Sequence, residues 1–189
     1  MSQHIEIEFK NLLTKVEYDE LINSLQYKHM TVKQTNYYFD TNDRQLQQQK
    51  CALRIREKNG QYILTFKEPA DVGALETKDF IDRATKQSWL NNSPTKTPHV
   101  YERIRLRKVA LSELHYFGAL KTKRTTFYVN DNITIALDNS FYHGKEDYEL
   151  EIEVTNERVG QKFFQTFLTE HNILVKQTMP KIRRFFSHI

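Results

Sequence analysis

Strict alternation of charged and apolar residues over several short segments constrains this chain more than any other feature. Residues 5–10 read IEIEFK, residues 53–56 read LRIR, and residues 147–154 read DYELEIEV. Side chains of a β-strand point alternately to opposite faces, so each segment predicts a strand with one apolar and one charged face. The charges of each strand therefore form a row along one face.

Other local signals fill in the elements between these strands. Thr14-Lys15-Val16-Glu17 has the form of a capping box and predicts a helix that ends near Gln26. Asn59-Gly60 predicts a hairpin between the strands of CALRIREKNGQYILTFK. Thr97-Pro98 predicts the start of a helix that continues through VYERIRLRKVALSEL, although the RIRLR core of this segment alternates well enough to be a strand.

The remaining segments complete an α+β pattern. Strands are predicted over residues 31–40, 74–80, 115–129 and 132–139, and helices over residues 82–91, 157–170 and 180–188. About eight antiparallel strands with helices between and after them indicate a closed or nearly closed β-barrel.

Length and composition restrict the class of protein. The 189 residues are expected to form a single domain over residues 1–189, and the net charge of +4 allows an anionic ligand without requiring one. The lone Cys51 excludes an intrachain disulfide and is expected to be a buried thiol. No apolar run approaches the roughly 20 residues of a membrane span, and a cytoplasmic location is expected.

The charged strand faces raise the question of where they point. One such strand taken alone would more simply expose its charges to water. If the helices cover the apolar faces, however, the charged faces line the interior of the barrel. Rows of buried carboxylates repel one another unless cations neutralise them, and clustered carboxylates suit Mg²⁺ or Mn²⁺. Arg and Lys side chains suit phosphate, so the pattern predicts a site for a metal complex of a polyphosphate.

An ordered series of motifs resembles that of the CYTH domain, also called the triphosphate tunnel metalloenzymes. The series consists of Glu6-x-Glu8-x-Lys10, Tyr38-Phe39-Asp40, Leu53-Arg54-Ile55-Arg56, Thr65-Phe66-Lys67, Leu137-Asp138, the Glu149/Glu151/Glu153 strand and Lys181. It covers essentially the whole chain, which is most similar to the small stand-alone CYTH proteins of Gram-positive bacteria. The resemblance implies an eight-stranded antiparallel β-barrel, a tunnel with helices packed outside and a short C-terminal helix.

The resemblance also implies roles for individual residues. The metal-binding set would be Glu6, Glu8, Asp138, Glu149, Glu151 and Glu153. The substrate-binding set would be Lys10, Arg54, Arg56, Lys67, Arg124 and Lys181. Glu149, Glu151 and Lys10 would be catalytic, and Glu76 is expected to join the acidic set.

Two basic segments fit this scheme less directly. Within residues 120–124, Arg124 is expected to face inward in preference to Lys123, because adjacent strand residues point to opposite faces. Arg103, Arg105 and Arg107 imitate the Arg54/Arg56 pattern but lie in a predicted helix, so they are expected to be mostly solvated.

The function implied is divalent-metal-dependent hydrolysis of inorganic triphosphate, thiamine triphosphate or a nucleoside triphosphate, with Mg²⁺ or Mn²⁺ as cofactor. One alternative is a class IV-type adenylyl cyclase, in which the ribose 3′-hydroxyl replaces water. Another is a non-catalytic regulatory protein that binds polyphosphate or RNA. The expected partner is a small-molecule triphosphate; neither a membrane nor a nucleic acid is favoured, and homodimer formation is left open.

Overall fold

The structure is a computed structural model and describes residues 2–176 and 178–187. Eight strands form a closed antiparallel barrel in the order β1-β5-β4-β3-β2-β6-β7-β8, which confirms the predicted fold class. Their bounds are β1 Ser2–Leu13, β2 His29–Asp40, β3 Ala52–Lys58, β4 Gln61–Pro69, β5 Ala74–Ile81, β6 His115–Asn130, β7 Ile133–Tyr142 and β8 Lys145–Val154.

The helices lie between and after the strands, as predicted. Their bounds are α1 Lys15–Ser24, α2 Gln45–Gln48, α3 Arg83–Leu90, α4 Val100–Leu106, α5 Glu157–Glu170 and α6 Lys181–Phe186, with a 3₁₀ turn η1 at Leu111–Glu113. The capping box before α1 is confirmed, because Thr14 and Glu17 exchange side-chain and backbone hydrogen bonds. Among the described residues, no helix combines the length and the apolarity that a membrane span requires.

The chain divides into two compact units. The first unit contains Met1–Ile5 and Gln34–Leu120, and the second contains Glu6–Lys33 and Lys121–Ile189. The expectation of a single domain stays a prediction.

The first unit has an apolar core to which its strands and its helices both contribute. Leu53 and Ile55 of β3 and Leu64 and Phe66 of β4 point into this core, where they meet Trp89 of α3 and residues of α2 and α4. Cys51 is part of the same core, so the prediction of a buried thiol is confirmed. The charged residues that alternate with these apolar ones must therefore point to the opposite face of the sheet.

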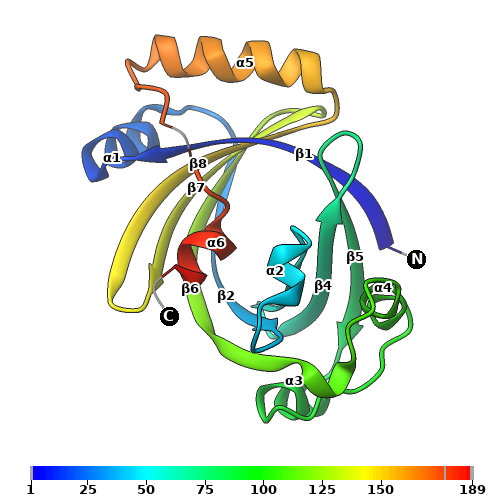
Figure 1. The fold of residues 1–189 in the computed structure, drawn as a ribbon. Coiled ribbons are helices and arrows are strands. Elements are labelled where there is room, and N and C mark those ends of the chain that lie inside the picture. The colour runs from blue at the N-terminus through cyan, green and yellow to red at the C-terminus, as the bar shows by residue number, and fades with distance from the viewer. Residues whose placement is uncertain (1, 177, 188–189) are drawn as a thin grey trace. The chain divides into compact units, whose positions relative to one another are not determined.

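The second unit is built in the same way, with α1 and α5 lying against its strands (Figure 1). Leu150 and Ile152 of β8 point into a core that also contains Leu21 of α1 and Phe167 of α5. Gly160 allows α5 to approach closely, since a Cβ atom there would lie 2.5 Å from Val154 Cγ2. The alternating residues of β8 lie on the opposite face, away from α1 and α5.

The predicted helix start at Thr97-Pro98 is wrong. Helix α4 begins at Val100, and its N-cap residue, His99, makes no side-chain capping bond. The Asp79 carboxylate of β5 instead accepts the amide hydrogens of His99 and Val100, at 3.0 and 2.7 Å. The cap thus comes from a residue that lies far away in the sequence, and α4 is also shorter than predicted.

Candidate active site

The carboxylate row of β8 lies on the charged face of the second unit and faces charged residues of both neighbouring strands. Lys10 of β1 is the register partner of Glu151. Asp138 of β7 is the register partner of Glu149. Register partners share a face, so these four side chains gather on one surface. The sequence predicted this face from alternation alone.

Arg124 of β6 lies at the centre of this cluster. Its guanidinium contacts both oxygens of Asp138, with Nε–Oδ1 and Nη2–Oδ2 distances of 2.7 and 2.6 Å, and it also contacts Glu151. Lys10 Nζ lies 3.3 Å from Glu151 Oε1 and 3.1 Å from Glu8 Oε1. The predicted orientation of Arg124 is confirmed, whereas Lys123 is exposed.

Helix α6 adds two cations to the same carboxylates. Lys181 Nζ contacts Asp138 and lies 2.9 Å from Glu151 Oε1 and 3.2 Å from Glu149 Oε1. Arg184 Nη2 lies 2.5 Å from Glu149 Oε2, and Arg184 Nε lies 3.0 Å from Asp147 Oδ2. Sequence reasoning identified Lys181 but missed Arg184. The available signal was their spacing, because residues three apart share one side of a helix.

Burial and neighbouring cations separate the acidities of the two central glutamates. Burial alone would raise the pKa of Glu151, but Arg124, Lys10 and Lys181 hold that pKa well below its ordinary value. Burial is also the largest effect on Glu149 and raises its pKa to about 7, with Lys181 opposing and Glu151 adding to the rise. The pair therefore combines a firmly ionised carboxylate with one that exchanges a proton near neutral pH.

Three further acids of the predicted set lie on the same face in more open positions. Glu6 and Glu8 share strand parity on β1 and are both half-buried. Glu153 is the register partner of Glu8 and is exposed. The metal-binding and catalytic roles assigned to the acids of this unit stay predictions.

The charged face of the first unit is mainly basic. Arg54 Nη2 lies 3.3 Å from Glu76 Oε1, and Lys78 Nζ lies 2.8 Å from Glu76 Oε2. Lys67 is the register partner of Glu76, and Arg56 Nε donates a hydrogen bond of 3.1 Å to Asn36 Oδ1. The predicted phosphate-binding residues of this unit thus share one face. Lys78 was missed, although it has the same strand parity as Glu76.

The expectation that Arg103, Arg105 and Arg107 are mostly solvated is wrong for two of them. Arg103 and Arg107 of the α4 segment both pair with Glu68 of β4, whose side chain is buried. Glu68 has the parity of the apolar core residues, so its buried charge requires nearby cations. Arg105 is exposed and pairs with Glu102 on the same helix, as predicted.

The donor atoms of the acidic cluster are carboxylate oxygens, which are suitable ligands for a divalent cation. Asp138, Glu149 and Glu151 supply buried oxygen ligands of the kind that hard cations prefer. Both carboxylate oxygens of Glu149 are buried and make ion pairs but no hydrogen bond of normal geometry. Within residues 2–176 and 178–187, however, no three His, Cys, Asp or Glu side chains are arranged as a formed metal site. Lysine and arginine supply the neutralising charge instead.

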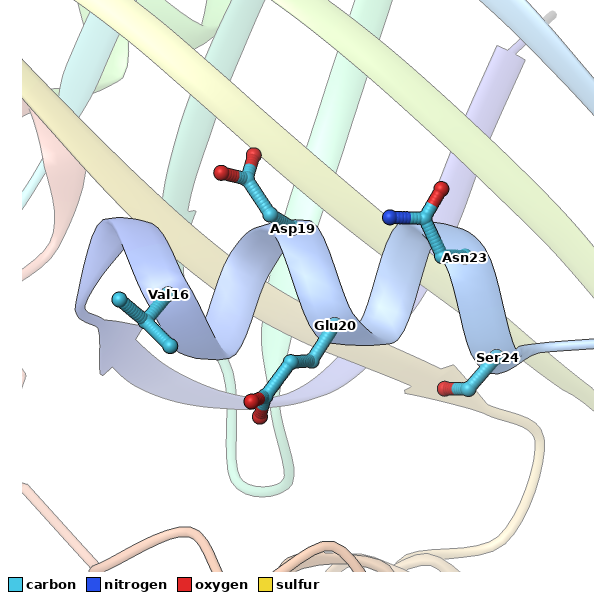
Figure 2. A pocket seen from close by; sticks show the side chains of 5 residues that line it. All are labelled: Val16, Asp19, Glu20, Asn23 and Ser24. Carbon is cyan, nitrogen blue, oxygen red and sulfur yellow. The ribbon is translucent and has the colours of Figure 1, made fainter.

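A hollow of about 490 Å³ lies beside α1. Figure 2 shows its lining side chains spreading from a single helix, and they are Val16, Asp19, Glu20, Asn23 and Ser24. None of them belongs to the predicted site.

Comparison with known proteins connects this geometry to a family. The sequence profile of the CYTH domain matches residues 4–186. The Bacillus subtilis (strain 168) protein named "Putative triphosphatase YjbK" is 40% identical over 188 residues, which are 99% of this chain and 97% of the relative.

Two solved structures resemble the fold. A protein of Bacillus halodurans described as a "putative adenylate cyclase" is 35% identical, with a TM-score of 0.92 and coverage of 98% of this chain and 100% of that one. HpAC1 from Hippeastrum is described as a "putative adenylyl cyclase" that reveals a dominant triphosphatase activity. It is 24% identical to this chain, with a TM-score of 0.82 and coverage of 97% of this chain and 96% of that one. With a profile match over nearly its whole length, the chain belongs to the CYTH domain family.

Proposed function

We propose that this protein is a divalent-metal-dependent triphosphatase, which hydrolyses inorganic triphosphate, thiamine triphosphate or a nucleoside triphosphate. The observation that carries this proposal is the cluster of the second unit, in which Asp138, Glu149 and Glu151 are buried together beneath cationic side chains. The name of the Bacillus subtilis relative supports the same activity.

The physical argument for a bound ligand is the free-energy cost of burying these charged groups. Each buried ion loses several kcal/mol of hydration, and well-packed apolar residues would often be at least as stable. Asp138 and Glu149 nevertheless lie side by side on adjacent strands. A cation bound to the acids, together with an anion bound to Lys10, Arg124 and Lys181, would make use of both sets of charges.

In the proposed mechanism the protein's own residues hold the substrate and move one proton. The metal would be held by Glu6, Glu8, Asp138, Glu149, Glu151 and Glu153, and when bound it supplies Lewis acidity toward the phosphate oxygens and the attacking water. Lys10, Arg124 and Lys181 of the second unit, and Arg54, Arg56 and Lys67 of the first, would bind phosphate oxygens.

The reaction forms a bond between the water oxygen and the terminal phosphorus and breaks the bond from that phosphorus to the bridging oxygen. Glu149 would accept the proton of the attacking water on its carboxylate. Glu151 stays ionised and helps to hold the nearby ammonium groups, and Lys10 stabilises charge on the oxygens of the transferred group.

The test is phosphate release from inorganic triphosphate, ATP and thiamine triphosphate, each with Mg²⁺, Mn²⁺ and EDTA. Release should require a divalent cation and should fall by at least a hundredfold in Glu149→Gln. Glu170→Gln, at an exposed carboxylate at the end of α5, is the matched control and should behave as wild type. Full release after exhaustive chelation, or from Glu149→Gln, would contradict the proposal.

A second candidate is cyclisation of ATP, which the name of the Bacillus halodurans protein favours. The same charged groups would bind the triphosphate, but the 3′-hydroxyl would attack the α-phosphorus and release pyrophosphate. Chromatography of the ATP reaction separates the two, since a cyclase forms cyclic AMP and a triphosphatase forms ADP and phosphate. The preference for Mg²⁺ or Mn²⁺, the cytoplasmic location and dimer formation stay predictions.

A further inference from the structure

Phe80 of β5 is exposed to an unusual degree for an aromatic side chain in a sheet, at 72% of its full accessible surface. Its neighbour Asp79 accepts hydrogen bonds from the start of α4, so Asp79 points toward the helices. Because strand residues alternate, Phe80 points to the other face, together with Lys78 and Glu76. Phe80 thus lies on the charged face of the first unit.

The strand register defines what surrounds Phe80. Its partner on β4 is Ile63, and the partner of Ile63 on β3 is Arg56. One step along the strands, Lys78, Thr65 and Arg54 form the next row of partners on the same face. Same-face residues on a strand are about 7 Å apart, and neighbouring strands are about 5 Å apart. Two apolar side chains therefore adjoin a strongly basic surface.

The charges of this surface favour an anion next to Phe80. On β3, β4 and β5 the charged face contains one carboxylate, Glu76, and five cationic side chains, which are Arg54, Arg56, Lys58, Lys67 and Lys78. Lone exposed apolar residues are common on proteins and need no explanation. An exposed ring paired with Ile63 at the border of such a basic face is a different arrangement, because it offers one surface to an anion and another to an apolar group.

A cross-strand contact between Ile63 and Phe80 would stabilise the sheet only modestly, and it does not require an exposed ring. A ring face that remains open can stack on a flat aromatic group, and it also attracts a cationic ring. Stacking of one base on one aromatic side chain is a substantial and sequence-tolerant contribution to binding.

We infer that Phe80, backed by Ile63, is the subsite for an aromatic ring that is joined to the triphosphate, so the preferred substrates are ring-bearing organic triphosphates rather than inorganic triphosphate. This inference rests on the proposed function, because the basic face is taken to bind the phosphates. A ring connected through a sugar or a short alkyl link can lie over Phe80 while its phosphates contact Lys78 and Arg54. Adenine and the rings of thiamine share this chemistry, and the experiment distinguishes them.

The experiment measures dissociation constants by calorimetry with Mg²⁺ present, using the β,γ-methylene analogues of ATP and of thiamine triphosphate and ring-free imidotriphosphate. In Phe80→Ala, the dissociation constant of at least one ring-bearing analogue should rise about tenfold, while that of imidotriphosphate should change by less than twofold. The analogue that loses affinity identifies the ring. Phe80→Tyr should restore the binding, since tyrosine keeps the stacking face.

Phe141→Ala is the matched control. Phe141 is also an exposed phenylalanine of a strand, but on β7 it has the parity of the core residues Ile135 and Leu137, opposite to the charged face. It should leave all three dissociation constants unchanged. The inference is overturned if Phe80→Ala weakens all three ligands equally, or if it weakens neither ring-bearing one. If wild-type protein binds none of the three, the proposed function itself fails, which is a separate result.

Discussion

The guanidinium of Arg184 on α6 lies 2.5 Å from Glu149 Oε2 on β8, and both side chains are buried. Arg184 also contacts Asp147 at 3.0 Å and donates a hydrogen bond of 2.6 Å to the Met179 carbonyl. This one side chain therefore joins the last helix to the carboxylate row that carries the proposed chemistry.

Replacing Arg184 with leucine should lower the free energy of unfolding by about 3 kcal/mol, because it leaves the buried Glu149 and the half-buried Asp147 with less compensating charge. Urea denaturation measures the loss. The double variant with Glu149→Gln should recover part of it, since the amide carries no charge. If Arg184→Leu costs the same with and without Glu149→Gln, the two residues are not energetically coupled.

Replacing Glu8 with glutamine should keep stability while removing function. The change removes the Glu8 ion pair with Lys10 but also relieves repulsion on a face that carries Glu6 and Glu153, so the metal-free protein should melt at the same or a higher temperature. Phosphate release should fall by at least a hundredfold, and the stabilisation by Mg²⁺ plus triphosphate should shrink. Thermal melts with and without ligands, beside one activity assay, test this. Lower metal-free stability with normal turnover would show that Glu8 has a structural role only.

The two look-alike arginine segments should respond differently to the same substitution. Arg56→Ala removes a charge-assisted phosphate contact and should weaken triphosphate binding and turnover at least tenfold, which corresponds to roughly 1.4 kcal/mol. Arg105→Ala on α4 should have little effect, because its side chain is exposed and pairs only locally with Glu102. Equal losses in the two variants would show that the phosphate site has been assigned to the wrong segment.

Glu76 should make the free energy of unfolding depend on pH in the acidic range. Burial by itself raises the pKa of Glu76, but Arg54, Lys78 and Lys67 together lower it to about 2 from an ordinary value of 4.5. The folded pKa is depressed, so this contribution is fully present above about pH 4.5 and is lost as the pH falls toward 2; it amounts to roughly 3 kcal/mol.

Chemical denaturation between pH 6 and pH 2.5 measures this dependence for wild type and for Glu76→Gln. The variant should be less stable at pH 6 and should lose less stability on acidification. Glu113→Gln, an exposed carboxylate of the same unit, should follow the wild-type curve. Parallel curves for wild type and Glu76→Gln would contradict the assignment.

Gly160→Ala should destabilise the protein by about 1–3 kcal/mol despite the better helix propensity of alanine. The new methyl group would lie 2.5 Å from Val154 Cγ2 and 2.7 Å from Phe9 Cε2, so α5 would have to move away from the sheet. Val154→Ala combined with Gly160→Ala should relieve part of the clash. A Gly160→Ala variant that is as stable as wild type would show that α5 shifts at no cost.

The sequence predicts well those parts of the fold that depend on residues close together in the chain. The alternation in β8 fixes its two faces, Asn59-Gly60 fixes the hairpin between β3 and β4, and the α5 pattern predicts Glu157–Glu170 with its observed bounds. These signals act over a few residues, and tertiary packing only reinforces them.

The sequence-based predictions fail where a residue far away in the sequence determines the local structure. The start of α4 depends on Asp79, which comes from a strand some twenty residues earlier. The orientation of Arg103 and Arg107 depends on Glu68, a buried acid whose need for cations cannot be inferred from the helix itself. Arg184 belongs to the same class, since its partners are fixed only when α6 is placed on β8.

The alternation of β8 also affects how reliably the chain folds. Because neighbouring side chains of a strand point to opposite faces, a pairing error of one residue against β7 would push Glu149 and Glu151 in among Leu137 and Phe167 and turn Leu150 and Ile152 toward the cations. Such a slipped pairing would bury two carboxylates without neutralising cations and would therefore be unstable. The row of acids proposed for chemistry therefore also selects the correct strand alignment during folding, before any metal or phosphate is bound.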